Sequence, residues 1–213
     1  IPNIGGIAIF VAVALPLLVG VIVARLVSAE QWIEWIPALA APGDDPLANV
    51  ARAVASTPIA LALLACCLLL HVTGLIDDRR GLGPWPKLLV QLFAAAVLVI
   101  FFDVRLLTLL PAPVSIAITI VWIVTITNAI NFLDNMDGLA AGVSAIAASL
   151  FMVATLVNAQ WFIAATLALL VGGLVGFLVF NFPPAKIFMG DGGSLVVGFL
   201  RGVLTARTTF YHE

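Results

Sequence analysis

The sequence predicts an all-α fold, a polytopic bundle of transmembrane helices. Of its 213 residues, 63% are hydrophobic and only 9% are charged, and the mean hydropathy is +1.23. Soluble domains average roughly 45–50% apolar and about 25% charged residues, so this is the composition of an integral membrane protein. Because apolar runs alternate with polar or Gly/Pro-containing stretches, we expect about seven membrane segments in a single domain, residues 1–213.

The first predicted segment, Ile4–Val27, is long enough to cross a bilayer, which takes about 20 apolar residues. Pro16 within it is tolerated because neighbouring helices can satisfy the freed carbonyl group. The next stretch, Ser28–Ser56, is polar and rich in proline, and we expect it to be a loop on one membrane face. Its Trp32 and Trp35 are typical of interfacial rings. Its predicted turn formers are Gly43, Asp44, Asp45 and Pro46.

The second predicted segment, Thr57–Ile76, leads directly into the polar stretch Asp77–Lys87, whose Gly and Pro residues end the helix. Five more apolar runs follow it. They are Leu88–Phe102, Val114–Thr127, Leu139–Val157, Trp161–Phe180 and Ser194–Ala206. The last of them is shorter than a full span, and Ser194 is its predicted N-cap.

Helix parity places three polar stretches on one membrane face. The stretches after the second, fourth and sixth segments emerge on the same side as the amino-terminal Pro2–Gly6. They contain Asp77, Asp134 and Asp191. A shared site requires this arrangement, because its groups must converge from several helices.

Four polar residues recur every third position from the end of the fourth segment, in the stretch NAINFLDNMDGLAAG. They are Asn128, Asn131, Asp134 and Asp137. Residues three apart lie near one another on a helix, and ionisable groups in membrane proteins face a partner, a cavity or an ion. A plain polar loop before a helix that starts at Asp137 is the alternative. The four polar positions followed by Gly-Leu-Ala-Ala-Gly favour a site.

Asp77 and Asp78 follow the second segment, where the helix dipole is already negative and a further anion is disfavoured. A hard cation such as Mg²⁺, with Mn²⁺ as an alternative, would compensate this charge and leave positions open for phosphate. Salt bridges to Arg79 and Arg80 are the structural alternative.

Asp191 lies among Gly190, Gly192 and Gly193, just before the last segment. Free N–H groups at a helix start attract anions, and Gly190 and Gly192 let a ligand approach the backbone. This predicts a carboxylate beside a phosphate cradle, with a plain Gly-rich turn as the alternative. We expect the carboxylates of Asp77, Asp78 and Asp191 to converge within reach of one metal ion.

Four motifs, IPNIGG, GLIDDRRGL, NAINFLDNMDGLAAG and MGDGGSLVVGF, together resemble the polyprenyl-phosphate N-acetylhexosamine-1-phosphate transferases (glycosyltransferase family 4), which include the bacterial MraY, WecA and TagO enzymes. They occur in the family's order over nearly the whole chain. The resemblance implies Mg²⁺-dependent transfer of an N-acetylhexosamine-1-phosphate from a UDP-sugar to polyprenyl (undecaprenyl) phosphate. We expect the transferred group to be GlcNAc-1-phosphate. UMP would be released, and the lipid-diphosphate sugar would begin the assembly of a cell-envelope polysaccharide such as lipopolysaccharide or teichoic acid.

The resemblance also implies roles for individual residues. Asp191 is the main Mg²⁺ ligand, and Asp77 lies at the metal as the base or phosphate-orienting group, with Asp78 beside it. The residues that hold the nucleoside part of the donor are Asn131, Asp134 and Asp137, with Asn128 supporting them.

Asn135-Met136, in place of the Gly-Leu common in MraY, favours the WecA/TagO-like branch, as does the run Arg79–Leu82. A MraY-like phospho-MurNAc-pentapeptide transferase is the alternative. Lys and Arg are divided between the two faces, so loop charge gives no orientation. We assign the motif face to the cytoplasmic side of a bacterial inner membrane because nucleotide substrates are cytoplasmic.

Family members have additional helices before IPNIGG and after GDGGS, including a His-rich cytoplasmic loop implicated in donor binding. We therefore expect this chain to be truncated at both ends and to lack part of the donor pocket. Arg201, where an apolar residue is expected, has no explanation in the resemblance. A homodimer is left open.

Two other classes of membrane protein also use buried carboxylates. An ion-coupled transporter would place them nearer the bilayer midplane. CDP-alcohol phosphatidyltransferases bind Mg²⁺ through a spaced aspartate signature that this sequence lacks. Nucleic acid is excluded as a partner, because the net charge is −2 and basic runs are missing.

Overall fold

A computed structural model describes residues 2–35 and 46–208. Its helices, in chain order, are α1 (Gly5–Leu26), α2 (Ala29–Trp35), α3 (Pro46–Ala55), α4 (Thr57–Arg80), α5 (Pro84–Phe101), α6 (Ala112–Leu133), α7 (Leu139–Val157), α8 (Trp161–Asn181) and α9 (Asp191–Arg207). Six of them, α1 and α4 to α8, are long and apolar enough to cross a membrane. The chain is therefore an integral membrane protein with an all-helical fold, as the sequence predicted.

Several helices run further than the apolar pattern indicated. Helix α5 begins at Pro84 rather than Leu88, because proline suits the first turn of a helix, so Lys87 lies on α5 and not in a loop. Helix α4 continues past Ile76 through Arg80 and is capped by Gly81, which takes a left-handed φ of 63° that suits glycine. Helix α6 continues past Thr127 to Leu133, so Asn128 and Asn131 lie on its last two turns rather than in a loop. Polar side chains do not end a helix when the adjacent helices supply hydrogen-bond partners.

The stretch Ser28–Ser56 is not a simple loop, which corrects the prediction. It contains α2 and α3, because Pro46–Ala55 starts with proline at the favoured first position and continues with good helix formers. Pro46 thus begins a helix. Gly43, Asp44 and Asp45, the other predicted turn formers, lie outside the described residues.

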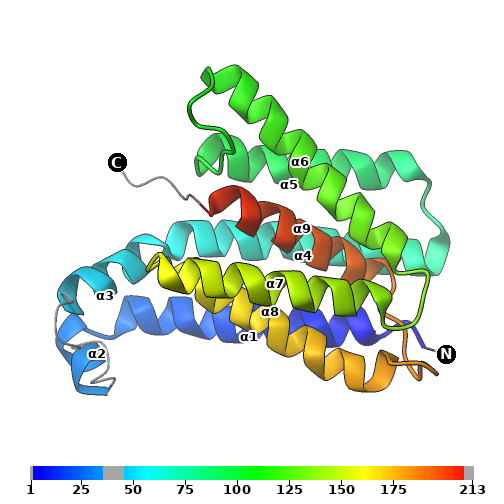
Figure 1. Cartoon of the computed structure of the whole chain (residues 1–213), viewed down its shortest axis with the longest axis horizontal. Helices are drawn as coiled ribbons and strands as arrows, with labels where there is room; N and C mark the ends of the chain where they lie inside the picture. The colour runs from blue at the N-terminus through cyan, green and yellow to red at the C-terminus, as the bar shows by residue number, and fades with distance from the viewer. Residues whose placement is uncertain (1, 36–45, 209–213) are drawn as a thin grey trace.

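Helix α9 occupies the centre of the bundle (Figure 1), with thirteen of its 17 residues buried against α4, α6 and α1. Glycines permit this close approach: a Cβ at Gly198 would lie 2.7 Å from Thr127 Cα, and one at Gly202 would lie 3.0 Å from Ile123 Cα. The predicted N-cap was wrong. Gly190 occupies that position, and Ser194 is fully buried within the first turn.

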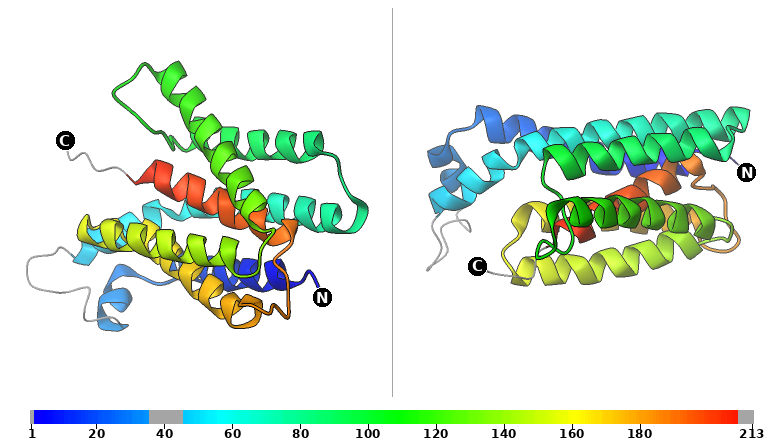
Figure 2. Two further views of the ribbon diagram at one scale, coloured as in Figure 1. Left: turned by 45° about the vertical axis from the view of Figure 1, so that its right-hand side comes forward. Right: turned by 90° about the horizontal axis from the view of Figure 1, so that it is seen from above.

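The structure confirms that the three polar stretches lie on the same side of the bundle as the amino-terminal segment. Figures 1 and 2 show the ends of α4 and α6 and the starts of α1 and α9 gathered at the end of the bundle where the amino terminus lies. The Gly5 and Gly6 N–H groups donate to the Phe188 and Met189 carbonyls, both at 3.0 Å. Helices α2 and α3 lie at the other end of the bundle, so its two ends are chemically distinct.

Candidate active site

Asp78 caps the start of α9. Its Oδ1 accepts the Asp191 N–H at 2.9 Å and its Oδ2 accepts the Gly192 N–H at 3.2 Å. Gly190 approaches so closely, with a φ of 69°, that a Cβ there would lie 2.7 Å from Asp78 Oδ2. The cradle of N–H groups that the sequence predicted for a ligand phosphate is therefore filled by a carboxylate of the same chain.

Lys87, from the first turn of α5, lies between two carboxylates. Its Nζ is 2.7 Å from Asp77 Oδ2 and 2.7 Å from Asp191 Oδ2. One ammonium group thus balances two carboxylates that lie 114 positions apart in the sequence. The other oxygen of the first carboxylate, Asp77 Oδ1, is buried and has no hydrogen-bond partner among the described residues.

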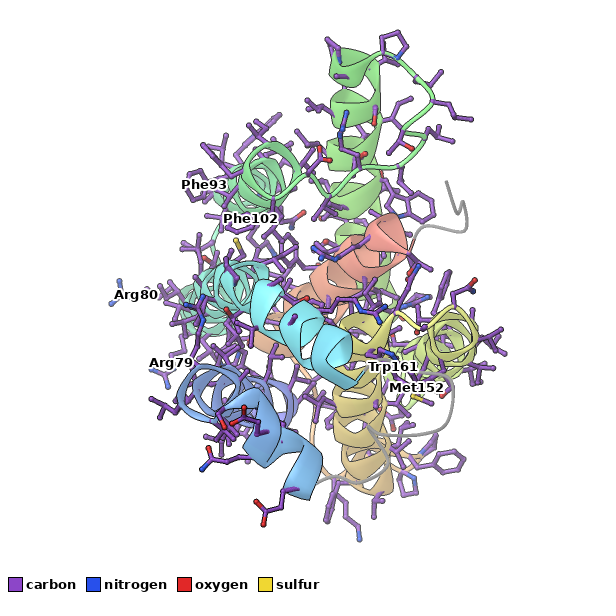
Figure 3. The ribbon with its side chains drawn as sticks, turned by 90° about the vertical axis from the view of Figure 1, so that its left-hand side faces the viewer. Arg79, Arg80, Phe93, Phe102, Met152 and Trp161 are labelled. Carbon is purple, nitrogen blue, oxygen red and sulfur yellow. The ribbon has the colours of Figure 1, made fainter. Side chains whose placement is uncertain are left out.

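Arg79 and Arg80 do not supply the counter-charge. Both side chains are exposed, and Figure 3 shows them projecting from the side of the bundle. In the described part of the chain, the ion pair of Asp77 is made with Lys87. The alternative of a salt bridge within the Asp77–Arg80 run is therefore not what the structure contains.

Asn131 joins α6 to the start of α9. Its Nδ2 donates to Asp191 Oδ1 at 2.9 Å and to Ser194 Oγ at 2.8 Å. One turn earlier, Asn128 Nδ2 donates to Gln91 Oε1 at 2.6 Å, and Gln91 Nε2 returns a longer bond of 3.4 Å. The two asparagines therefore hold α5, α6 and α9 in a fixed relation around the carboxylates.

Asp134 and Asp137 lie beyond the end of α6, near the stretch that precedes α9. Asp137 Oδ2 accepts the Ala185 N–H at 3.0 Å. Burial raises the pKa of Asp134 to about 7, the Gly190 N–H opposes the shift, and the negative charges of Asp191 and Asp78 add to it. Both residues thus belong to the same end of the bundle as the Lys87 cluster.

His71, in the middle of α4, also supports the start of α9. Its Nδ1 lies 2.7 Å from the Gly192 carbonyl oxygen, so Nδ1 carries the proton and donates. Its ring stacks on Phe10 of α1, with centroids 4.5 Å apart and planes 7° from parallel. This buried histidine connects three helices behind the acidic cluster.

The structure places the carboxylates of Asp77 and Asp191 on one ammonium group, that of Lys87, whereas the Asp78 carboxylate accepts N–H groups at the start of α9. The described residues contain no group of three such side chains that could share a metal ion, so the predicted convergence of all three carboxylates on one ion is not found.

Sequence reasoning missed two residues, Lys87 and Gln91. The available signal was their spacing of four in an otherwise apolar helix, which puts both on one face. Gly190 lies close to Asp78 and Gly192 lies close to Leu75, and the contact of the two glycines with a ligand stays a prediction.

Comparison with known proteins matches residues 60–209 to the sequence profile of glycosyl transferase family 4. The chain belongs to this family. A Bacillus subtilis protein named "probable undecaprenyl-phosphate N-acetylglucosaminyl 1-phosphate transferase" is 38% identical to it over 152 residues, 68% of this chain and 42% of that protein.

Two further relatives carry the name phospho-N-acetylmuramoyl-pentapeptide-transferase. The one from Lactobacillus gasseri is 36% identical over 160 residues, 67% of this chain and 49% of its own. One from Streptococcus pneumoniae is 32% identical over 166 residues, 71% and 50% of the two chains. The chain thus spans about half the length of the curated relatives it matches.

Proposed function

We propose that the protein containing this chain transfers N-acetylglucosamine-1-phosphate from UDP-N-acetylglucosamine to a membrane polyprenyl phosphate, releasing UMP. The observation that carries this proposal is the cluster of Asp77, Lys87 and Asp191 at one end of a membrane bundle, in which the two aspartates belong to two of the four family motifs. A lipid acceptor accounts for a site at helix ends near a membrane surface. A transporter is disfavoured because these carboxylates are not at mid-helix.

The oxygen atoms of the cluster fit Mg²⁺. Asp77 Oδ1 is buried without a hydrogen-bond partner in the described part of the chain, and Asp191 offers a second carboxylate across Lys87. The described residues group no third carboxylate, histidine or cysteine with them. Mg²⁺ is often held by one or two carboxylates together with phosphates and water, so Asp191 and Asp77 would hold it. When bound it would neutralise phosphate charge, and Mn²⁺ would substitute for it.

The residues of the chain have separate tasks in this reaction. A phosphate monoester is already largely a dianion at neutral pH, so the acceptor needs orientation more than deprotonation. Lys87 supplies positive charge to substrate phosphates, and Asp77 positions its ammonium group through their 2.7 Å contact. Asp78 holds the Asp191–Gly192 backbone, and Asn131 fixes the Asp191 carboxylate.

The chemical step is a phosphoryl transfer. An oxygen of the lipid phosphate forms a bond to the sugar-linked phosphorus of the donor. The bond from that phosphorus to the bridging oxygen breaks, and its electron pair leaves with UMP. Asp134 and Asp137, beside the cluster, would contact the nucleoside part of the donor.

Asn135-Met136 supports UDP-N-acetylglucosamine as the donor. The names of the relatives divide between N-acetylglucosaminyl and N-acetylmuramoyl-pentapeptide transfer at similar identity. UDP-MurNAc-pentapeptide is therefore the second candidate. The protein acts in a bacterial plasma membrane with this site on the cytoplasmic face, where nucleotide sugars are made.

The test compares both donors with the full-length protein in membranes supplied with undecaprenyl phosphate and Mg²⁺. Formation of labelled lipid from UDP-N-acetylglucosamine, but not from UDP-MurNAc-pentapeptide, supports the proposal. Product from the pentapeptide donor alone overturns the donor assignment. Full activity after exhaustive removal of divalent cations overturns the metal assignment. Asp191→Asn should lower the rate at least a hundredfold, and the exposed Lys186→Gln should leave it unchanged.

A further inference from the structure

A cavity of about 730 Å³ lies at the end of the bundle opposite the carboxylate cluster. Its walls come from the second half of α1, the end of α3, the starts of α4 and α8, and the last turn of α9. Figure 3 looks onto this end and labels Trp161, one of the lining residues. Its volume falls in the range of about 300–1,000 Å³ that small-molecule sites occupy.

Two arginines line the cavity. They are Arg52 of α3 and Arg207 of α9, and the lining includes no acidic side chain among the described residues. Arg207 lies over the Phe162 ring, 5.6 Å from its centroid. A third arginine, Arg25, donates from Nε at 2.7 Å to the hydroxyl of Thr57, which also lines the cavity. Three arginines beside an apolar space favour an anion.

The interior walls are mostly apolar, with Leu17, Val21 and Leu169 among the lining residues. Two tryptophans, Trp32 and Trp161, complete the lining, and such rings are typical of the level of lipid headgroups. Trp32 Nε1 is buried and has no hydrogen-bond partner among the residues that the structure describes. Its N–H is a donor without an acceptor, which suits an ester or phosphate oxygen.

We propose that this cavity binds one membrane phospholipid with an anionic headgroup. The phosphate lies between Arg52 and Arg207, and an acyl chain lies along the apolar walls of α1 and α8. An apolar tail and an anionic head are both required, because the same cavity has mostly apolar walls and two arginines in its lining. The site is distinct from the carboxylate cluster and does not depend on the chemistry proposed there.

The first test is native mass spectrometry of the full-length protein in detergent, titrated with phosphatidylglycerol or phosphatidylcholine. We expect one phosphatidylglycerol to be retained at least fivefold better than phosphatidylcholine. The pair Arg52→Gln and Arg207→Gln should abolish that preference. The pair Arg79→Gln and Arg80→Gln, which removes the same charge at the other end of the bundle, should preserve it.

A second variant keeps both arginines and fills the space. A Cβ at Gly20, which lines the cavity, would meet nothing within 4 Å, so Gly20→Leu extends into it. The control is Gly172→Leu, at an equally open glycine outside the cavity. We expect only Gly20→Leu to lose phosphatidylglycerol.

Several outcomes would overturn the proposal. They are equal loss in the Arg79/Arg80 control, retention in Gly20→Leu, or no phosphatidylglycerol on the wild type. The last result would mean that other parts of the longer protein fill the cavity.

Discussion

At the scale of single residues, the central feature is one ammonium group shared by two carboxylates. Removing it with Lys87→Met leaves Asp77 and Asp191 close together and unbalanced, since both contact Nζ at 2.7 Å. We expect the variant to melt several degrees lower than the wild type in the presence of a chelator. We also expect Mg²⁺ to raise its melting temperature more than that of the wild type, because a metal ion replaces the lost charge.

The control for Lys87→Met is Lys186→Met, which removes an exposed lysine near the same end of the bundle. It should behave like the wild type with and without Mg²⁺. Equal Mg²⁺ responses in all three proteins would show that the two carboxylates do not bind the metal.

Asp134 gives a pH prediction. The pKa of Asp134 is about 7 in the folded protein and roughly 4 in an unfolded chain. Ionisation of this carboxyl as the pH rises therefore favours the unfolded state. Stability contributed by the neutral carboxyl is present below about pH 4 and is lost as the pH rises through about 7. Asp134→Asn should therefore stabilise the metal-free protein more at pH 8 than at pH 5.

Melting temperatures at the two pH values test this expectation. Glu30→Gln, an exposed carboxyl on α2 at the other end, is the control. An identical shift for Asp134→Asn at both pH values would contradict the raised pKa.

At the scale of elements, the site depends on the close contact of α4 with the start of α9. A Cβ at Gly74 would lie 2.4 Å from the backbone of Asp191 and Gly192. Gly74→Ala must therefore push α9 away from α4 and displace the Asp191 carboxylate. We expect it to lower both transferase activity and melting temperature.

The matched control is Gly142→Ala on α7, where a Cβ would meet nothing within 4 Å. This substitution should raise helix stability by up to about 1 kcal/mol and leave activity intact. Equal activity loss in the two variants would show that the α4–α9 contact is not what positions the site.

The sequence predicted the membrane helices well, because apolar runs of about 20 residues leave few alternatives in lipid. The run Leu139–Val157 matches α7 at both ends. What the sequence could not predict was which polar groups pair across helices. Asp77 and Asp78 carry the same charge, so the sequence does not distinguish their partners. In the structure Asp78 lies against Gly190 and caps α9, while Asp77 contacts Lys87.

At the scale of the whole molecule, parity puts the cluster and the cavity at opposite ends of one bundle. Single cysteines at Arg80 and Lys186 should react with an impermeant thiol reagent from the same side of the membrane, and a cysteine at Gln31 from the other. All three positions are exposed, whereas the native Cys66 and Cys67 are buried and serve as the unlabelled background. Labelling of position 31 together with position 186 would refute the topology.

Phosphosugar transfer is tested most directly with a doubly labelled donor. UDP-N-acetylglucosamine carrying radiophosphorus in its β-phosphate and tritium in its sugar is given to the full-length protein with undecaprenyl phosphate. We predict that both labels enter the lipid in the ratio of the donor, and that UMP is released. Tritium in the lipid without radiophosphorus, with UDP as the leaving nucleotide, would contradict the proposed function.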